Sequence, residues 1–413
     1  MFNEKSIRSV ESKVLSKAFV NIDEKYNLVN IPGTILKNFG IEVSNSLPLD
    51  VIGDNKKYPK VVLMVIDALG YNFFEKYYTK SFFLNEIVQD GRVSKLTTQF
   101  PSTTTCNITT LNTGLPVSDT GIYEWYYYEK KLDAVFNPLR FMKAKEKEVL
   151  DYDASLLLPN TNLYTQIPVP SYVFQYELFN KSPYSKWIYR GSNVISFTSL
   201  KEGLTNLKTV LEKEDAVYCY FYHGDFDEAS HHYGPDAKET EKCLLDILND
   251  LDQFFVDIKT LELKDTLFMI TSDHGQTRVI NENTIYINLE FPEILPFLKK
   301  NARGEYIAPC GSSRDMFLHV NPMDKDKAFH FLKENLHNKA EVYKIEELIE
   351  KGVFGKNEFS QPFYDRIGDI VILPYRNYQV WWYEKDYFYV KHQGMHGGLS
   401  KEEMEIPFLV YKV

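Results

Sequence analysis

Three continuous apolar runs stand out along the chain, and each one ends in polar residues. They are VVLMVI (61–66), AVYCYFY (216–222) and TLFMIT (266–271). Apolar runs that do not alternate with polar residues are typical of strands buried on both faces, as in a parallel sheet. We therefore predict three parallel strands in the interior of the protein.

A helical pattern separates the last two runs. Large apolar residues recur there at three- and four-residue spacing, which predicts an amphipathic crossover helix; they are Leu244, Leu248, Leu251, Phe255 and Ile258. Strand, helix and strand in this order make a βαβ unit, so the sequence predicts an α/β fold. Ligands of such folds bind at the carboxyl ends of the strands, where the polar residues after each run would converge.

Aromatic and turn-rich segments divide the rest of the chain. Residues 1–58 are predicted to be an N-terminal extension that packs on the core. The α/β core would cover 59–280 and 386–413, with an aromatic insertion at about 123–195. Residues 281–385 hold separate strand-like runs and a helix, so we expect a small α+β cap there.

The charge balance excludes one class of partner. With 57 acidic and 47 basic residues the net charge is −10, whereas nucleic-acid polymers are bound through Lys and Arg. A small anionic substrate remains open if the site carries its own cations. The four cysteines are scattered without a CxxC pair, which predicts reduced thiols and neither a disulfide framework nor a cysteine-based zinc site.

The N-terminal sequence bears on location. Charges interrupt residues 1–23, which contain no apolar signal-peptide region. Nothing later reaches the roughly 18 uninterrupted apolar residues of a membrane span. We therefore expect a cytoplasmic protein with no membrane partner, and the oligomeric state is left open.

Four separate segments offer metal-ligand chemistry. They are VIDALG, GDFDEASHHYGP, SDHGQ and MHGGLS, which contain Asp67, Asp227 and His231, Asp273 and His274, and His396. Carboxylate oxygen and imidazole nitrogen together suit zinc or a similar divalent ion. Two such ions roughly 4 Å apart would hold the attacking and leaving oxygens of a phosphoryl group. A fifth segment, FPSTTTCNITTLNTG (100–114), offers threonine hydroxyls as nucleophiles.

The order of these five segments resembles the alkaline phosphatase superfamily, and within it the type I phosphodiesterase/nucleotide pyrophosphatase branch. The resemblance covers about residues 60–280 and 365–413. It implies a doubly wound, mostly parallel central sheet with helices on both faces and a small α+β cap. It also implies two divalent metal ions, with zinc expected and manganese or another ion as the alternative.

The resemblance assigns roles to individual residues. One ion would be held by Asp227, His231 and His396. The other would be held by Asp67, Asp273, His274 and the nucleophile. The family places its threonine ten positions before the Gly of a Thr-Gly pair, which here gives Thr104.

Some assignments stay open. Thr103 is the alternative nucleophile, and Asp225 is the alternative to Asp227 in a shifted register. His232 adjoins a predicted ligand but is expected to point elsewhere. The close nucleotide pyrophosphatases carry a phosphate-binding asparagine about 21 residues after the nucleophile, where this chain has Trp125. Trp125 and Tyr126 are expected to contact substrate, by stacking a base. The alternative is that Tyr126 to Tyr128 only pack the cap onto the core.

The expected activity is hydrolysis of phosphodiester or nucleotide pyrophosphate bonds through a phosphothreonine intermediate. The substrate would be a small phosphorylated molecule, with nucleotides among the candidates. A phosphomonoesterase or phosphonate hydrolase is the enzyme alternative, for which Arg314 could supply an extra cation. A catalytically dead metal-binding module is the alternative from another class.

Overall fold

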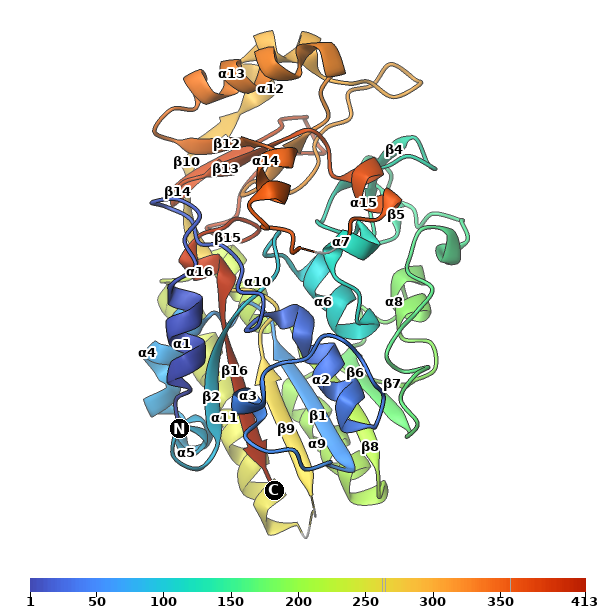
Figure 1. The fold of residues 1–413 in the computed structure, drawn as a ribbon, viewed down its shortest axis with the longest axis vertical. Helices are drawn as coiled ribbons and strands as arrows, with labels where there is room; N and C mark the ends of the chain where they lie inside the picture. The colour runs from blue at the N-terminus through green and yellow to red at the C-terminus, as the bar shows by residue number, and fades with distance from the viewer. Residues whose placement is uncertain (262, 264, 357) are drawn as a thin grey trace.

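A central sheet of seven strands organises the computed structural model, which describes residues 1–261, 263, 265–356 and 358–413 (Figure 1). From edge to edge the strands are β2 (Arg92–Thr97), β16 (Glu405–Lys412), β9 (Thr266–Thr271), β1 (Lys60–Ile66), β8 (Val217–His223), β6 (Ser171–Tyr176) and β7 (Asn193–Phe197). β16 is antiparallel to both of its neighbours. The pairs β9–β1, β1–β8, β8–β6 and β6–β7 are all parallel. The predicted α/β fold with a mostly parallel sheet is confirmed.

The three apolar runs form the middle of this sheet. Every residue of β8 and β9 is buried, as are all but the first residue of β1. Odd-numbered residues of β1 face one apolar cluster and even-numbered residues face another, so both faces are covered. This double burial is the reason that the runs do not alternate with polar residues.

Helices cover both faces. One face carries α4 (Tyr71–Tyr77), α5 (Phe82–Asp90), α9 (Leu200–Lys213) and α11 (Lys238–Thr260). The other carries α2 (Ile31–Asn38), α6 (Thr104–Thr113) and α8 (Pro183–Ile188). The five apolar residues that predicted the crossover helix are all buried on α11.

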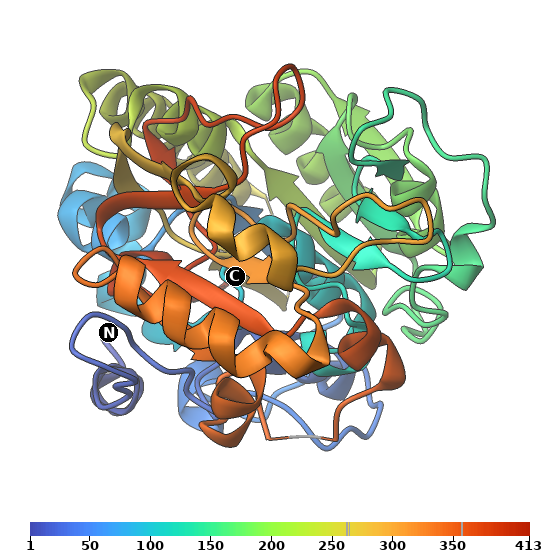
Figure 2. The same ribbon diagram turned by 90° about the horizontal axis from the view of Figure 1, so that it is seen from above.

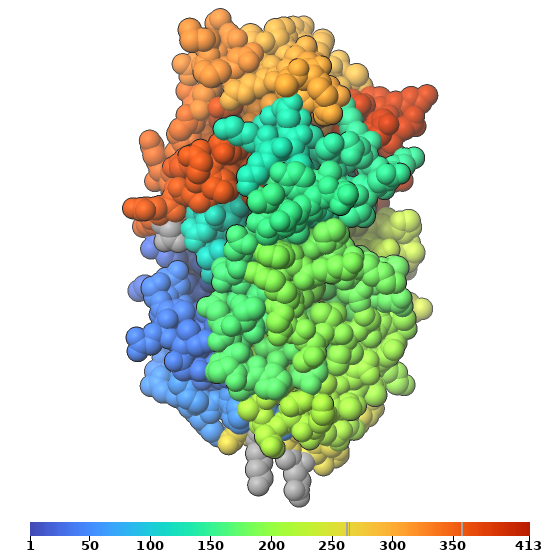
Figure 3. All heavy atoms as spheres, turned by 90° about the vertical axis from the view of Figure 1, so that its right-hand side faces the viewer, coloured from blue at the N-terminus to red at the C-terminus, as the bar shows by residue number. Residues whose placement is uncertain are grey.

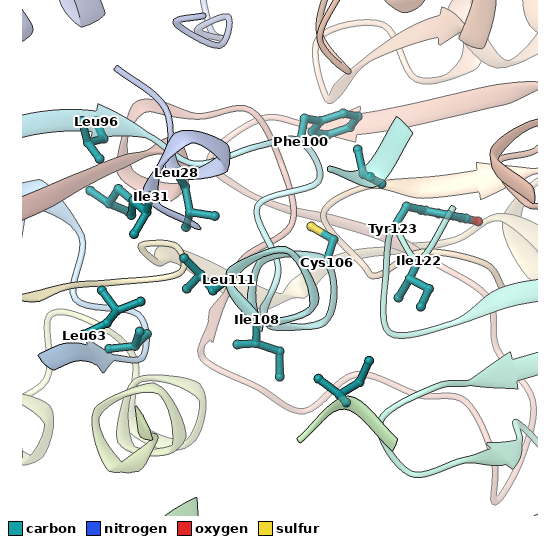
Figure 4. Close-up of a cluster of buried hydrophobic side chains, with 14 of the residues drawn as sticks. Leu28, Ile31, Leu63, Leu96, Phe100, Cys106, Ile108, Leu111, Ile122 and Tyr123 are labelled. Atoms are coloured by element: carbon teal, nitrogen blue, oxygen red, sulfur yellow. The ribbon is translucent and has the colours of Figure 1, made fainter. Parts of the chain in front are cut away.

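The threonine-rich stretch forms α6, and all ten residues of this helix are buried. Apolar side chains surround it, among them Leu28, Ile31 and Tyr123 (Figure 4). Its polar side chains donate hydrogen bonds to carbonyls one turn earlier, such as Thr109 Oγ1 to Thr105 O at 2.6 Å and Asn112 Nδ2 to Ile108 O at 2.7 Å. Because these side-chain donors find acceptors within the helix, burying them costs less than burying unpaired polar groups.

A cap lies at one end of the molecule, and both chain termini lie toward the other end (Figure 1). Figure 2 looks down on the cap. Its sheets are β14–β10–β15 and β11–β13–β12. Their strands are β10 (Thr277–Tyr286), β11 (Met316–Leu318), β12 (Ala340–Lys344), β13 (Ile370–Pro374), β14 (Asn377–Trp381) and β15 (Gly394–Met395). Helices α12 (Ile287–Glu290) and α13 (Lys325–Asn335) cover them, and a third apolar cluster forms the core of the cap.

The segment 123–195 differs from a simple insertion. Its first part makes a small sheet of β3 (Tyr127–Glu129), β4 (Ala134–Asn137) and β5 (Met142–Lys143). Its last part supplies β6 and the start of β7, so the central sheet extends into it. Figure 3 shows this segment spread over one face of the molecule. Serine, proline and glycine between its aromatic residues hid these strands in the sequence pattern.

The N-terminal segment packs on the core. Helix α1 (Glu4–Glu11) contacts β2, and Phe2 and Asn27 form single bridges to residues of that strand. Within the residues that the structure describes, no helix is both long and apolar enough to cross a membrane.

Candidate metal centre

The polar residues that follow the core strands meet at one edge of the sheet. Asp67 comes directly after β1, and Asp273 and His274 follow β9. Asp227 and His231 lie on α10 (Asp225–Tyr233), which follows β8. Thr104 begins α6, and His396 directly follows β15. Convergence at the carboxyl ends of parallel strands is typical of ligand sites in α/β folds.

One cluster consists of Asp67, Asp273 and His274, whose ligand atoms all lie within 4.8 Å of one another. His274 Nε2 is 3.3 Å from Asp67 Oδ1 and 3.6 Å from Asp273 Oδ2. These two carboxylate oxygens are buried and have no hydrogen-bond partner among the described residues. Burial and the neighbouring carboxylates of Asp227 and Asp273 raise the pKa of Asp67 well above its ordinary value. A cation fits here, because it would offset this crowding of negative charge.

A second cluster consists of Asp227, His274 and His396, also within 4.8 Å of one another. His396 Nε2 is 3.9 Å from Asp227 Oδ1, and the rings of His274 and His396 stack at a centroid distance of 3.8 Å. His231 lies beside this cluster, with Nε2 3.3 Å from Asp227 Oδ2. His274 therefore belongs to both clusters, which together are consistent with a binuclear metal site.

Backbone carbonyls orient the three histidines in the same way. His231 Nδ1 is 2.8 Å from Gly394 O, His274 Nδ1 is 3.0 Å from Gly275 O, and His396 Nδ1 is 3.1 Å from Ser102 O. A carbonyl only accepts, so each Nδ1 carries a proton and donates it, which turns each Nε2 toward the carboxylates. This outer hydrogen bond is the usual way in which a ligating histidine is fixed. Burial lowers the pKa of His396 well below its ordinary value, which also keeps that ring neutral.

Thr104 lies at the first position of α6, with Thr103 as the preceding cap residue. Its Oγ1 is 3.0 Å from His274 Nε2, so its hydroxyl lies against the residue that the clusters share. The first N–H groups of a helix have no partner inside it, and the helix dipole favours an anion there. The start of α6 is thus suited to a phosphate oxygen.

Other candidates lie elsewhere. Arg314 is fully buried and binds both carboxylate oxygens of Glu403 at 3.0 Å, as well as the carbonyls of Tyr375 and Tyr378. It therefore cannot supply a cation to substrate, and that expectation is wrong. Asp225 is exposed beside His223, and His232 is exposed against Tyr233.

The two aromatic candidates have different surroundings. Tyr126 pairs its backbone with Gly311, and its ring meets Phe388 edge-on at 5.7 Å. It therefore joins the aromatic segment to the cap. Trp125 is partly exposed, with the Arg140 guanidinium 5.4 Å from its ring centroid.

Three residues near the clusters escaped the sequence analysis. Tyr222 OH donates to Asp67 Oδ2, and Gln276 Nε2 donates to Asp227 Oδ1. The ring of His392 is 4.7 Å from that of His231. Each lies within five residues of a predicted ligand in the sequence, but only the fold shows which way it points.

Comparison with known proteins agrees with this geometry. The overall architecture is the alkaline phosphatase-like fold, and the model of the "Type I phosphodiesterase / nucleotide pyrophosphatase" family matches residues 61–399. The chain belongs to this family. A comparison with curated protein sequences gives no match.

Solved structures of ectonucleotide pyrophosphatase/phosphodiesterase 5 share the fold. The murine protein is 19% identical with a TM-score of 0.64, over 85% of this chain and 88% of that one. An inactive murine form in complex with AMP is 18% identical with a TM-score of 0.64, over 85% and 87% of the two chains. The human protein is 19% identical with a TM-score of 0.60, again over 85% and 87%.

Proposed function

We propose that this protein is a two-metal hydrolase of phosphodiester or nucleotide pyrophosphate bonds, with Thr104 as its nucleophile. The observation that carries the proposal is the position of Thr104 Oγ1, 3.0 Å from the histidine shared by two Asp/His clusters. Family membership and the AMP complex of a relative support a nucleotide as substrate.

The residues present fit two divalent ions. Asp67, Asp273, His274 and Thr104 would hold one, and Asp227, His231 and His396 the other. The oxygen and nitrogen donors favour zinc, with manganese as the alternative. When bound, the ions would lower the pKa of the threonine hydroxyl and of water, and stabilise charge on the phosphoryl group.

The chain's own groups would then carry out two displacements. Thr104 Oγ1 attacks phosphorus and expels the leaving group, which forms a phosphothreonine ester. The first N–H groups of α6 bind a phosphoryl oxygen as negative charge grows on it. Water then cleaves the ester and regenerates the hydroxyl.

Release of nitrophenol tests this proposal. The protein is stripped with chelator and supplied with zinc or manganese, then given a nitrophenyl phosphodiester, nitrophenyl phosphate and a nitrophenyl phosphonate. Metal-dependent turnover that is fastest with the diester supports the proposal. Faster turnover of the monoester or phosphonate would favour the other enzyme classes, and metal binding without any turnover would favour a non-catalytic module.

We also propose a cytoplasmic location. Support comes from the four cysteines, which are free thiols, as is usual in a reducing compartment. Fractionation of the source cells with a specific antibody tests it, and recovery in an extracellular fraction would contradict it.

A further inference from the structure

Two buried carboxyl groups meet near the turn that holds the predicted nucleophile. Glu124 lies in the segment before β3, and Asp315 lies in the cap just before β11; both are fully buried. They converge on Gly397, the residue after His396. A Cβ built there would lie 2.7 Å from Asp315 Oδ1 and 3.1 Å from Glu124 Oε1.

The surroundings supply too few hydrogen bonds for two anions. Asp315 Oδ1 accepts from Ser312 N at 3.0 Å and from Ser312 Oγ at 2.5 Å, and Glu124 Oε2 accepts from Trp125 N–H. Asp315 Oδ2 and Glu124 Oε1 have no donor among the described residues. The two side chains lie within hydrogen-bonding reach of each other, so one proton shared between them would relieve this shortage of donors.

The neighbouring charges favour the same arrangement. The titratable groups that face the pair are the acids Glu403, Cys106 and Tyr123. Arg314, the next residue to Asp315, is already bound to Glu403. Burial raises the pKa of Glu124 to about 7, and burial together with the Glu124 carboxylate raises the pKa of Asp315. Two adjacent buried carboxylates without a cation cannot both be ionised at low cost.

The pair borders two turns of the metal centre. Thr103, the cap residue of α6, faces the Glu124 carboxyl, and Ser312 Oγ lies 3.2 Å from His396 O. The same two turns are joined directly, since Ser102 Oγ donates to Gly398 O at 2.7 Å and Gly397 N donates to Ser102 Oγ at 3.2 Å. The carboxyl pair therefore lies on the buried side of three segments: the turn that holds the nucleophile, the turn that holds His396, and the cap.

We propose that Glu124 and Asp315 share one proton in a buried hydrogen bond, and that this bond positions the turn of Thr104 against the turn of His396. The two are positioning residues, since neither touches the reacting atoms. The role rests on the proposed function, but the shared proton itself can be tested without turnover.

Matched variants separate the hydrogen bond from the bulk of the side chain. Glu124→Gln and Asp315→Asn keep the shape and replace the shared proton with an amide N–H, whereas Glu124→Ala removes the bond. Glu129→Gln is the control, because Glu129 is an equally buried carboxylate nearby that binds Arg366. All are studied as the zinc-loaded protein.

The first measurement is infrared difference spectroscopy at neutral pH. A band of a protonated carboxyl group should be present in the wild type and in Glu129→Gln, and absent from Glu124→Gln and Asp315→Asn. If the wild type has no such band, the shared proton is disproved, whatever the activity.

The second measurement is zinc affinity by chelator competition, which also needs no turnover. Loss of one buried hydrogen bond should weaken zinc binding in Glu124→Ala by about tenfold, while Glu124→Gln stays within about threefold of the wild type. Equal zinc affinity in Glu124→Ala and the wild type would overturn the positioning role.

Steady-state kinetics complete the test. With a nitrophenyl diester, Glu124→Ala should lower kcat by about tenfold and leave KM within about twofold, and Glu124→Gln should restore most of kcat. A fall in kcat that Glu124→Gln does not rescue would overturn the role of the bond. An inactive wild type that retains the infrared band and the zinc effect would overturn the proposed function alone.

Discussion

Thr104 is distinguished from its neighbours by where its side chain points. Thr104 Oγ1 meets His274, Thr103 faces Glu124, and Thr109 donates to a helix carbonyl. Thr104→Ala should therefore lower kcat by about a thousandfold or more, and Thr104→Ser should keep part of it. The control is Thr109→Ala on the same helix, which should stay active, and a chiral phosphorothioate substrate should show net retention at phosphorus. Inversion would mean direct attack by water.

His274 belongs to both clusters, but its one free ring nitrogen, Nε2, can bind only one ion at a time, because Nδ1 is held by the Gly275 carbonyl. His274→Ala should therefore weaken the ion that it shares with Asp67 and Asp273, and His231→Ala should weaken the other ion. Removal of a ligand typically costs orders of magnitude in affinity, so about one ion per chain should remain in each variant. Metal analysis after dialysis checks this, and two tightly held ions in either variant would contradict the assignment of its ligand.

The residue types of the site could be read from the sequence, but their partners could not. Asp67, Asp273 and His274 follow apolar runs, and this local context is visible in the amino-acid sequence. Arg314 looked equally available, yet Glu403, far along the chain, holds it inside the protein. Glu124 carried no motif at all, because its interest depends on Asp315 and Gly397 in three dimensions.

At the scale of elements, double burial made the central strands predictable and partial burial hid the others. β1, β8 and β9 are covered on both faces, so their composition is almost purely apolar. β7 lies at the edge of the sheet, and its first two residues, Asn193 and Val194, are exposed. The sequence of an edge strand is less constrained than that of a central strand. For this reason the sequence pattern did not reveal β7 as a strand, and its residues were predicted to belong to an insertion.

The turn after β9 depends on close contact between backbones. A Cβ at Gly275 would lie 2.1 Å from Glu402 O and 3.0 Å from Gly70 Cα. Gly275→Ala should therefore destabilise the protein by about 3 kcal/mol or more and displace His274. Gly224→Ala is the control at the neighbouring strand end, because its nearest atom beyond the adjacent residues would be 3.7 Å away. Thermal unfolding and zinc content check both, and an unchanged Tm in Gly275→Ala would contradict the close contact.

At the scale of the whole molecule, the metal centre links stability to pH. Burial and adjacent carboxylates raise the pKa of Asp67, so the metal-free protein should lose stability as pH rises above the ordinary Asp range. A bound cation would offset the cost of ionising Asp67. Protons also compete with the cation for the ligands less at higher pH. The gain in Tm on adding zinc should therefore grow from about pH 5 to about pH 8. A gain that shrinks over this range would contradict the prediction.

Trp125 and Tyr126 are both partly exposed rings of the aromatic segment, and they differ in what they contact. The backbone of Tyr126 pairs with Gly311 and its ring packs against Phe388, so we expect Trp125 to be the ring that stacks on a base. Stacking contributes roughly 1–3 kcal/mol per base. We expect Trp125→Ala to raise KM about fivefold or more for a nucleoside nitrophenyl diester, with a smaller change in kcat.

Two comparisons make this prediction specific. A nitrophenyl diester without a base should show no change in KM, and Trp187→Ala should have no effect, although Trp187 has a similar arginine contact, with Arg190 4.1 Å from its ring. In the wild type, kcat/KM for the nucleoside diester should exceed that for the matching monoester. An aromatic ring interacts better with the second ester group of the diester than with the additional negative charge of the monoester. An equal rise in KM for both diesters would mean that Trp125 shapes the site without binding a base. Better turnover of the monoester would remove the diesterase assignment and leave the two-metal mechanism in place.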